Sequence, residues 1–493
     1  MNIRPYFCTI LLLSMWPWNV AVEAADRPNV LILFADDQRP DAVHAFGNEV
    51  IQTPNIDSLV QEGFRFERAY CMGSMTGAVC VPSRAMLNSG RSLFRVDHKL
   101  LGIPTAGETF GQQGYVTFGT GKWHNGAESF LRSFQQGTAV FLGGMNDHTK
   151  VPLVDVANGE MTNKRVGDGF SSTLFADAAV DFLKSQDSEK PFYAYVAFTA
   201  PHDPRQFPDE VADLYPPEEM AMPVNYLPQH PFFNGWMTGR DETLAPWPRT
   251  KTIIRHQLAE YYRMITHLDQ QIGRVLQALE ESGQADNTII VYAADHGLAL
   301  GSHGLLGKQS VYEHSMGTPL VLKGPGISAE RSSRAFAYLF DIFPSLCQLT
   351  GVTPPEGVEG KSLVPIWQGR SHSVRPSIFL AYETFMRAIR TDRWKLIRYP
   401  HINRTQLFDL EKDPFELHDL ANDHRQAQRV ADMFALLEQA QVDYGDTLPL
   451  TSKDPVDDYI DLTGHKRKPD QHQPEWIVRK YFELEGWDWQ DSE

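Results

Sequence analysis

The chain has 493 residues, of which 42% are hydrophobic and 22% charged, and its formal net charge is −17 at neutral pH. This is the composition of an ordinary globular protein, without a fixed-period repeat or a long low-complexity run. The strong negative charge argues against nucleic acid or an acidic membrane surface as a partner. An anionic ligand would therefore have to be held by a local cluster of cations.

The first 24 residues have the pattern of a secretory signal peptide. Arg4 supplies a positive start, residues 10–15 form a short apolar stretch, and residues 22–24 (V-E-A) resemble a cleavage site. The apolar stretch is too short to span a membrane comfortably, and Pro17 interrupts it. We therefore expect residues 1–24 to be a signal peptide and the protein to be exported, periplasmic or secreted, without stable membrane insertion.

Three of the four cysteines follow this segment, namely Cys71, Cys80 and Cys347. An odd number of cysteines in an exported protein leaves at least one of them unpaired. A scaffold held together by disulfides is therefore not expected, and the unpaired cysteine should be either buried and inert or chemically special.

Up to about residue 350, apolar runs and turn residues predict alternating strands and helices. Buried strands are expected at residues 29–35, 64–69, 116–120, 192–198, 288–294 and 320–322. Helices are expected at residues 54–62, 82–88, 252–281 and 338–349. The helix at 252–281 has the clearest pattern, because its apolar residues recur every three or four positions. Such alternation predicts an α/β fold, with a large, mostly parallel sheet sandwiched by helices.

After Gly369 the chain changes to short strands separated by turns and followed by a helix. The strands are expected at residues 378–382, 387–390, 394–399 and 407–409, and the helix at 426–444. We interpret this part as a smaller C-terminal subdomain with an antiparallel sheet and a helix. The predicted organisation is a main domain at 25–370, an α+β subdomain at 371–445 and a tail at 446–493.

Polar side chains lie at or just past the ends of several predicted strands of the main domain. They are Asp36, Asp37, Lys122, His124, His202, Asp295 and His296. In open parallel sheets, ligands bind beyond the carboxyl ends of the strands. We therefore expect these side chains to form a single site at one edge of the sheet.

Cys80 begins the stretch C-V-P-S-R, which continues to Leu87 and Gly90-Arg91. This stretch resembles the signature of the type I, formylglycine-dependent sulfatases of the alkaline phosphatase superfamily. In that family a maturation enzyme oxidises the cysteine to formylglycine; one hydroxyl of the hydrated aldehyde attacks sulfur, and the other later expels sulfate. The resemblance implies that Cys80 is the precursor of the nucleophile, that Arg84 holds the hydrated aldehyde, and that a formylglycine-generating enzyme is a partner. The alternative for Cys80 is a buried structural thiol.

Asp36, Asp37, Asp295 and His296 resemble the cation ligands of these enzymes, with the oxidised Cys80 as a further ligand. Three carboxylates at strand ends repel one another unless a cation lies among them. Hard oxygen ligands favour calcium or magnesium over zinc. We expect one Ca²⁺ ion, with Mg²⁺ as the alternative, because a histidine nitrogen is a less typical calcium ligand.

Three further segments resemble family motifs. In G-K-W-H, Lys122 would balance charge on the sulfate oxygens, and His124 would assist hydroxyl deprotonation when sulfate is expelled. In A-P-H-D-P, His202 would help to protonate the leaving oxygen. In the last segment, G-K, Lys308 would lie beside the bridging oxygen. The resemblance thus implies a sulfatase, a sulfuric-ester hydrolase.

The resemblance does not identify the substrate, because recognition residues lie on variable loops. The motifs are most similar to those of bacterial carbohydrate, iduronate and choline sulfatases, so we expect a sulfated carbohydrate of polysaccharide or glycosaminoglycan type. Loop residues near the core motifs are candidates for holding the sugar: Arg39, His98, Asn146, Asp147, His148 and Arg205.

Two other interpretations stay open at this point. One is a phosphonate monoester hydrolase or phosphodiesterase, since relatives in the same superfamily use the same oxidised cysteine on phosphorus. The other is a glycan-binding protein that keeps the scaffold without catalysis. A two-zinc phosphatase is less favoured, because we find ligands for one cation and a cysteine where those enzymes use serine or threonine.

Overall fold

The computed structural model describes residues 27–186, 189–329, 331–462, 465 and 472–482. The predicted signal peptide at 1–24 lies outside the described residues. Within them, no helix has both the length and the apolar composition that crossing a membrane requires.

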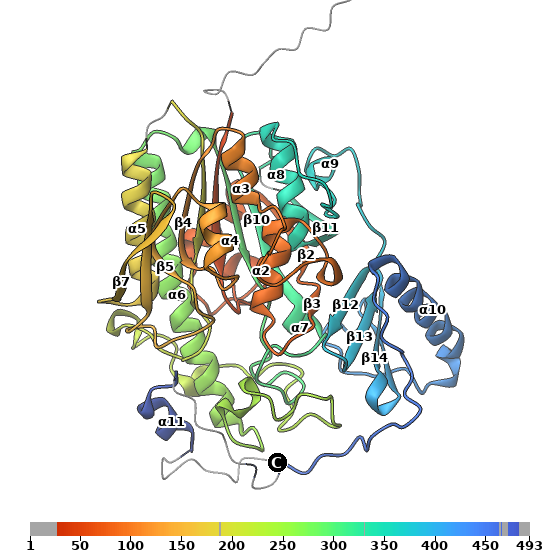
Figure 1. Cartoon of the computed structure of the whole chain (residues 1–493). Helices are drawn as coiled ribbons and strands as arrows, with labels where there is room; N and C mark the ends of the chain where they lie inside the picture. The colour runs from red at the N-terminus through yellow and green to blue at the C-terminus, as the bar shows by residue number, and fades with distance from the viewer. Residues whose placement is uncertain (1–26, 187–188, 330, 463–464, 466–471, 483–493) are drawn as a thin grey trace, which may run out of the picture.

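The main domain is built on one large sheet of ten strands (Figure 1). They are β1 (Asn29–Ala35), β2 (Phe64–Tyr70), β4 (Val116–Lys122), β5 (Gln136–Phe141), β6 (Pro152–Ala157), β7 (Glu160–Val166), β8 (Phe192–Ala197), β9 (Thr288–Ala294), β10 (Gly317–Lys323) and β11 (Arg331–Tyr338). Their order across the sheet is β11-β2-β10-β9-β1-β8-β4-β5-β6-β7.

The prediction of a mostly parallel sheet is confirmed for its centre, where β9, β1, β8, β4 and β5 all run in the same direction. β10 runs antiparallel to both of its neighbours, and β6 and β7 add an antiparallel hairpin at one edge. The sequence analysis missed β5, β6, β7 and β11. β7 is mostly exposed and β11 begins with four polar residues, so neither has the continuous apolar pattern of a buried strand.

Helices cover both faces of this sheet. They are α1 (Pro54–Glu62), α2 (Cys80–Ser89), α3 (Ala106–Gln112), α4 (Ala127–Ser133), α5 (Ser171–Ser185), α6 (Lys251–Glu281), α7 (Glu313–Met316), α8 (Ile342–Thr350) and α9 (Val364–Trp367). Successive side chains of β1 point to opposite faces. Ile32 and Phe34 pack in the apolar core that contains residues of α2, α3, α4 and α8, whereas Leu31 and Leu33 pack with α1, α5 and α6.

The second sheet has five strands, and its strands after residue 370 are antiparallel, as predicted. They are β3 (Gly73–Ser74), β12 (Ile378–Tyr382), β13 (Met386–Arg390), β14 (Trp394–Tyr399) and β15 (Arg404–Asp409). β3 comes from the main domain and pairs in parallel with β12. A Cβ atom on Gly73 would lie 1.8 Å from the carbonyl oxygen of Ala381, so the pairing requires glycine there. This strand joins the second sheet to the loop that leads to Cys80.

The helix α10 (Ala427–Tyr444) packs on the second sheet through Met433 and Leu437. The chain then runs along this sheet, where Asp446 pairs with Arg387. A final helix, α11 (Glu475–Phe482), packs against α6 instead. The C-terminal part of the chain therefore contacts both the second sheet and the main domain.

Candidate active site

The strand-end residues converge at the carboxyl edge of the parallel strands. β1 and β9 are neighbours in register up to Ala35 and Ala294, so Asp36-Asp37 and Asp295-His296 emerge side by side. On the other side of β1 lies β8, and β4 follows it and ends at Lys122. The predicted single site is therefore present as a cluster, as parallel topology requires.

Cys80 is the first residue of α2, buried at the edge of this cluster. The helix is fixed against β9 because the Ser83 hydroxyl donates to the carbonyl oxygen of Asp295 at 2.7 Å. One turn after Cys80, the Arg84 guanidinium lies 3.2 Å from an Asp295 oxygen and 3.5 Å from an Asp36 oxygen. It also donates to the carbonyl oxygen of Lys122 at 2.7 Å. Arg84 thus ties α2 to three strand ends.

Four of the predicted metal ligands lie close enough together to share one ion. Ligand atoms of Asp36, Asp37, Cys80 and His296 all lie within 4.8 Å of one another, and all four residues are buried. His296 Nε2 is 3.3 Å from the Cys80 sulfur and 3.4 Å from Asp37 Oδ1. The fifth, Asp295, lies beside them: its Oδ1 is 3.5 Å from His296 Nε2 and accepts the backbone N–H of Asp37 at 2.9 Å.

Two buried lysines neutralise the aspartates of this cluster. Lys122 forms an ion pair with Asp36. The ammonium of Lys308 lies 2.8 and 3.0 Å from the two oxygens of Asp37 and 3.3 Å from the Cys80 sulfur. The sequence analysis placed both lysines in the site, and the structure brings them into it.

The surroundings of Asp36 and Asp37 shift the pKa values of these two carboxyl groups in opposite directions. Burial and the charge of Asp295 act to raise the pKa of Asp36, but Lys122 and Arg84 outweigh them and hold this pKa below its usual range. At Asp37, burial is stronger than the attraction of Lys308, and the pKa lies well above its usual range. Burial thus disfavours the charged form of Asp37, and a bound cation would favour it.

Both predicted histidines reach the site. His124 has a positive φ of 67° and lies against Gly144, where a Cβ atom would be 2.5 Å from its Nε2. Its Nδ1 has no hydrogen-bond partner among the described residues. His202 places Nδ1 2.8 Å from the carbonyl oxygen of Asp203 and Nε2 3.9 Å from Asp37. Burial lowers the pKa of both histidines well below the usual range, so both are neutral at neutral pH.

A cavity of about 310 Å³ opens onto this cluster. Its lining residues are Gly77, Ala78, Cys80, His124, Gly144, Met145, His202, Trp236, Arg240, Asp241, Lys308 and Gln309. The cavity brings Cys80, both histidines and Lys308 together with the aromatic side chain of Trp236. A cavity of this volume has room for a tetrahedral anion beside these groups.

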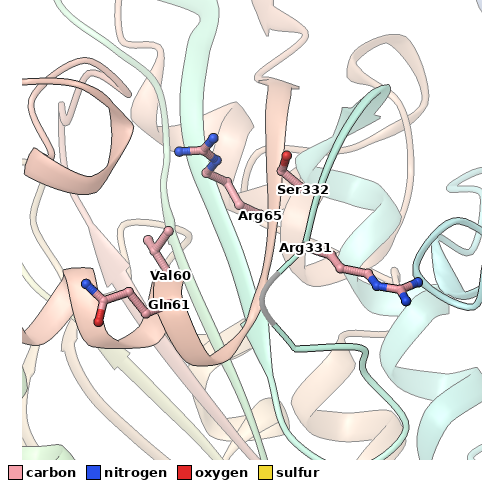
Figure 2. A pocket seen from close by; sticks show the side chains of 5 residues that line it. All are labelled: Val60, Gln61, Arg65, Arg331 and Ser332. Atoms are coloured by element: carbon pink, nitrogen blue, oxygen red, sulfur yellow. The ribbon is translucent and has the colours of Figure 1, made fainter.

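A larger cavity of about 520 Å³ lies elsewhere, where α1 meets the starts of β2 and β11 (Figure 2). Its lining residues are Val60, Gln61, Arg65, Arg331 and Ser332, with no carboxylate, histidine or thiol. Arg65 already donates to the carbonyl oxygen of Ala45 and stacks on Phe46. The residues that line the larger cavity thus include none of the groups that converge at the smaller one.

The six loop residues that we proposed as sugar contacts do not line the catalytic cavity. Arg39, Asp147 and Arg205 are held by protein groups, namely the Asp41 carboxylate, the Thr149 hydroxyl and the Pro201 carbonyl, respectively. His148 lies behind His202, with Nε2 3.0 Å from its carbonyl oxygen. Asn146 donates to the carbonyl oxygen of Lys150, and His98 offers its carbonyl to Asn125. Polar loop residues near the motifs mostly stabilise the loops themselves.

Several residues that line the cavity were not predicted from the sequence, among them Met145, Trp236, Arg240 and Gln309. Gln309 directly follows Lys308, and Met145 precedes Asn146, so proximity to motifs could have indicated both. Trp236 and Arg240 lie in a long segment of irregular structure between β8 and α6, without a motif or periodic pattern. Only the tertiary structure places them opposite Cys80.

Comparison with known proteins gives the family. The family model described as sulfatase matches residues 28–352, and the model described as the C-terminal region of N-sulphoglucosamine sulphohydrolase matches residues 301–443. An arylsulfatase of Clostridium perfringens is 29% identical over 459 residues, which cover 82% of this chain and 92% of the relative. An N-acetylglucosamine-6-O-sulfatase of Bacteroides thetaiotaomicron is 27% identical over 513 residues, 87% of this chain and 89% of the relative.

Among solved structures, a protein in complex with its substrate D-glucosamine-2-N,6-O-disulfate has a TM-score of 0.72 at 24% identity. The match covers 87% of this chain and 100% of that chain, and it shows a common fold. The first family match alone covers more than half of the 493 residues, including every predicted catalytic residue. The chain therefore belongs to the sulfatase family and is a sulfuric-ester hydrolase.

Proposed function

We propose that this enzyme removes sulfate from a sulfated carbohydrate, with the oxidised side chain of Cys80 as nucleophile and one calcium ion bound beside it. The observation that carries the proposal is the convergence of Cys80, Lys308 and two neutral histidines on one cavity, beside the buried ion pair of Lys122 and Asp36. The names of the relatives support a sugar substrate, since one acts on N-acetylglucosamine 6-O-sulfate and another on hexuronate 2-O-sulfate.

The donor set fits a hard divalent cation. Asp36, Asp37 and His296 would hold it together with the oxygen of the oxidised Cys80, and Asp295 lies at the margin of the cluster. Asp36 Oδ1 is buried and has no hydrogen-bond partner among the described residues, as an oxygen reserved for a metal would. The bound cation would stabilise negative charge at the nucleophile oxygen and the sulfate. Carboxylate donors favour Ca²⁺ or Mg²⁺, and we propose Ca²⁺.

The nucleophile depends on a maturation enzyme. Oxidation of Cys80 by that enzyme would give the aldehyde formylglycine. Addition of water to the aldehyde would then supply two geminal hydroxyls, one to attack sulfur and one to release the sulfate. Arg84, buried and bound to Asp36 and Asp295, fixes the helix start that carries this group. The unmodified thiol would be a poor nucleophile, because burial raises the pKa of Cys80 well above its usual range.

The remaining residues stabilise charge and move protons. Lys122 and Lys308 place two buried ammonium groups where the sulfate oxygens would lie, and preorganised charges of this kind are the largest catalytic contribution in many enzymes. His124 is neutral and its Nδ1 is unpaired among the described groups, so it can accept a proton from a hydroxyl. His202 can stabilise the leaving oxygen, because negative charge that develops beside it raises its pKa and favours its protonated form.

Export follows from the same proposal, because sulfated polysaccharides are extracellular polymers. We propose that residues 1–24 are removed and that the enzyme acts in the periplasm or outside the cell. Sequencing the N-terminus of the purified protein tests this: a mature chain that begins near Ala25 supports export, and an intact Met1 in an extracellular fraction contradicts the cleavage.

The test of function compares the wild-type enzyme with Cys80→Ala and, as a matched control, Cys347→Ala, which removes a second buried thiol outside the cavity. Sulfate release from sulfated oligosaccharides and from 4-nitrophenyl sulfate is measured by ion chromatography. Hydrolysis of a phenyl phosphonate ester is measured in parallel, as the test of phosphonate monoester hydrolase activity. We expect release from sulfated sugars by the wild type and Cys347→Ala only. Faster turnover of the phosphonate ester, or equal activity of Cys80→Ala, would contradict the proposal.

A further inference from the structure

A segment from the far C-terminal end of the chain, residues 472–482, lies against the outside of the catalytic site. Its helix α11 is anchored on α6, where the Tyr481 hydroxyl donates to Glu260 at 2.5 Å and Lys480 forms an ion pair with the same carboxylate. Ile477 and Tyr481 are buried in an apolar cluster with residues of α6. Figure 1 shows α11 beside one end of α6, on the opposite side of the molecule from α10.

Immediately before α11, Gln473 donates a hydrogen bond to Asp203 Oδ2. Arg240 binds the same carboxylate through two guanidinium nitrogens, at 3.0 and 2.5 Å. His202 Nδ1 lies 3.2 Å from Asp203 Oδ1. Arg240 and His202 both line the catalytic cavity, whereas Gln473 does not. Asp203 therefore links a residue of the C-terminal segment to two cavity groups.

The same segment contacts a second loop of the cavity. His472 Nδ1 lies 3.2 Å from the side-chain oxygen of Asn146. Asn146 directly follows Gly144 and Met145, which line the cavity next to His124. The C-terminal segment thus touches both the loop after β5 and the loop after β8, and residues of both loops line the cavity.

We propose that the C-terminal segment 472–482 is part of the substrate-recognition apparatus, with Gln473 as a positioning residue that fixes Arg240 through Asp203. This inference rests on the proposed function and adds a specificity element to the same site. Among the described residues, no hydrogen bond or ion pair connects the segment to Lys122 or Lys308. The segment reaches the cavity through Asp203, which contacts Arg240 and His202, so we expect its influence to fall on how the sugar and the leaving oxygen are positioned.

The physical reason is the geometry around Asp203. A buried carboxylate that binds a forked guanidinium needs its remaining lone pairs satisfied by further donors. Gln473 supplies such a donor on the oxygen that also binds Arg240 Nη2. Loss of the amide removes one donor from Asp203 Oδ2. Arg240, about one third exposed and also paired with Asp241 at 2.8 Å, can then shift relative to the cavity. A small shift in a substrate-positioning group lowers turnover of the substrates that contact it.

The experiment compares Gln473→Ala, Gln473→Lys and the control Trp476→Ala, which changes an exposed position of α11. Values of kcat/KM are measured for a sulfated oligosaccharide and for 4-nitrophenyl sulfate, with the melting temperature of each variant. For Gln473→Ala we expect the ratio of sugar to aryl kcat/KM to fall about tenfold, which corresponds to about 1.4 kcal/mol. Gln473→Lys restores a donor to Asp203 and should return the ratio toward that of the wild type.

A purely structural role for Gln473 would lower both activities in proportion and leave this ratio unchanged, and that result would overturn the inference. Failure of Gln473→Lys to recover the ratio that Gln473→Ala loses would also overturn it. If the wild-type protein released sulfate from neither substrate, the proposed function would be wrong, and the inference that rests on it would be wrong as well.

Discussion

Replacing Lys308 by alanine removes a buried cation that contacts both Asp37 and Cys80. Its ammonium lies 2.8 Å from the nearer Asp37 oxygen and 3.3 Å from the Cys80 sulfur, so it is already in place before a sulfate ester binds. Loss of one preorganised charge-stabilising donor lowers kcat by roughly 10²–10³ in comparable sites. We expect Lys308→Ala to lose about that factor in kcat.

The same substitution should also destabilise the fold. Removing one partner of a buried ion pair costs about 3–5 kcal/mol, because the other charge is left uncompensated. Here that charge is Asp37, whose pKa burial already raises well above the usual range. A bound Ca²⁺ ion would neutralise Asp37 in place of the lysine. The loss of stability should therefore be larger in EDTA than in calcium.

The assay measures kcat on 4-nitrophenyl sulfate and the melting temperature in calcium and in EDTA. Lys323→Ala is the matched control, because Lys323 forms a partly exposed ion pair with Glu62 away from the cavity. If Lys308→Ala turned over substrate as fast as Lys323→Ala, Lys308 would have no role in charge stabilisation.

Three further results are expected. Dialysis against EDTA should abolish sulfate release, and added Ca²⁺ should restore it. Full activity in protein that elemental analysis shows to be metal-free would contradict the cation site. Arg375→Ala breaks a buried, forked ion pair with Asp341 and should lower the free energy of unfolding by about 3–5 kcal/mol in urea titrations; a loss below about 1 kcal/mol would mean that the pair behaves like an exposed one. Stability should decline as the pH falls below 6.5, because burial lowers the pKa of His230 to about 3 and that of His303 to about 4. Below pH 6.5 these two histidines bind protons in the unfolded chain but not in the folded chain, so acid favours unfolding. Urea unfolding midpoints that stay constant down to about pH 4 would refute the predicted loss of stability.

The centre of the fold and of the site could be predicted from the sequence because both depend on local patterns. β1 and β9 are continuous apolar runs, and each is followed at once by acidic residues. In a parallel sheet the ends of neighbouring strands meet, so the cluster of Asp36 and Asp295 follows from the topology alone. The helix at 252–281 was predicted to within one residue at its start, because its apolar stripe is uninterrupted.

The rest depends on contacts between distant segments, which no local pattern indicates. Among the described strands, β7 pairs with β6 alone, and it is largely exposed, so it lacks the apolar alternation of a buried strand. Arg240 and Gln473 are separated from Asp203 by long stretches of sequence and meet it only in the folded chain. Arg39 and Arg205 were predicted as sugar contacts from their proximity to motifs, yet protein carbonyl and carboxylate oxygens hold both of them.

The chemical identity of residue 80 in the active enzyme is the most direct test of the mechanism. Mass spectrometry of the peptide that spans Cys80, on a preparation whose sulfate release has been measured, should find an aldehyde that reacts with a hydrazide probe. The fraction of modified peptide should rise and fall with activity between preparations. Full sulfatase activity in protein that carries only the unmodified thiol would contradict the account.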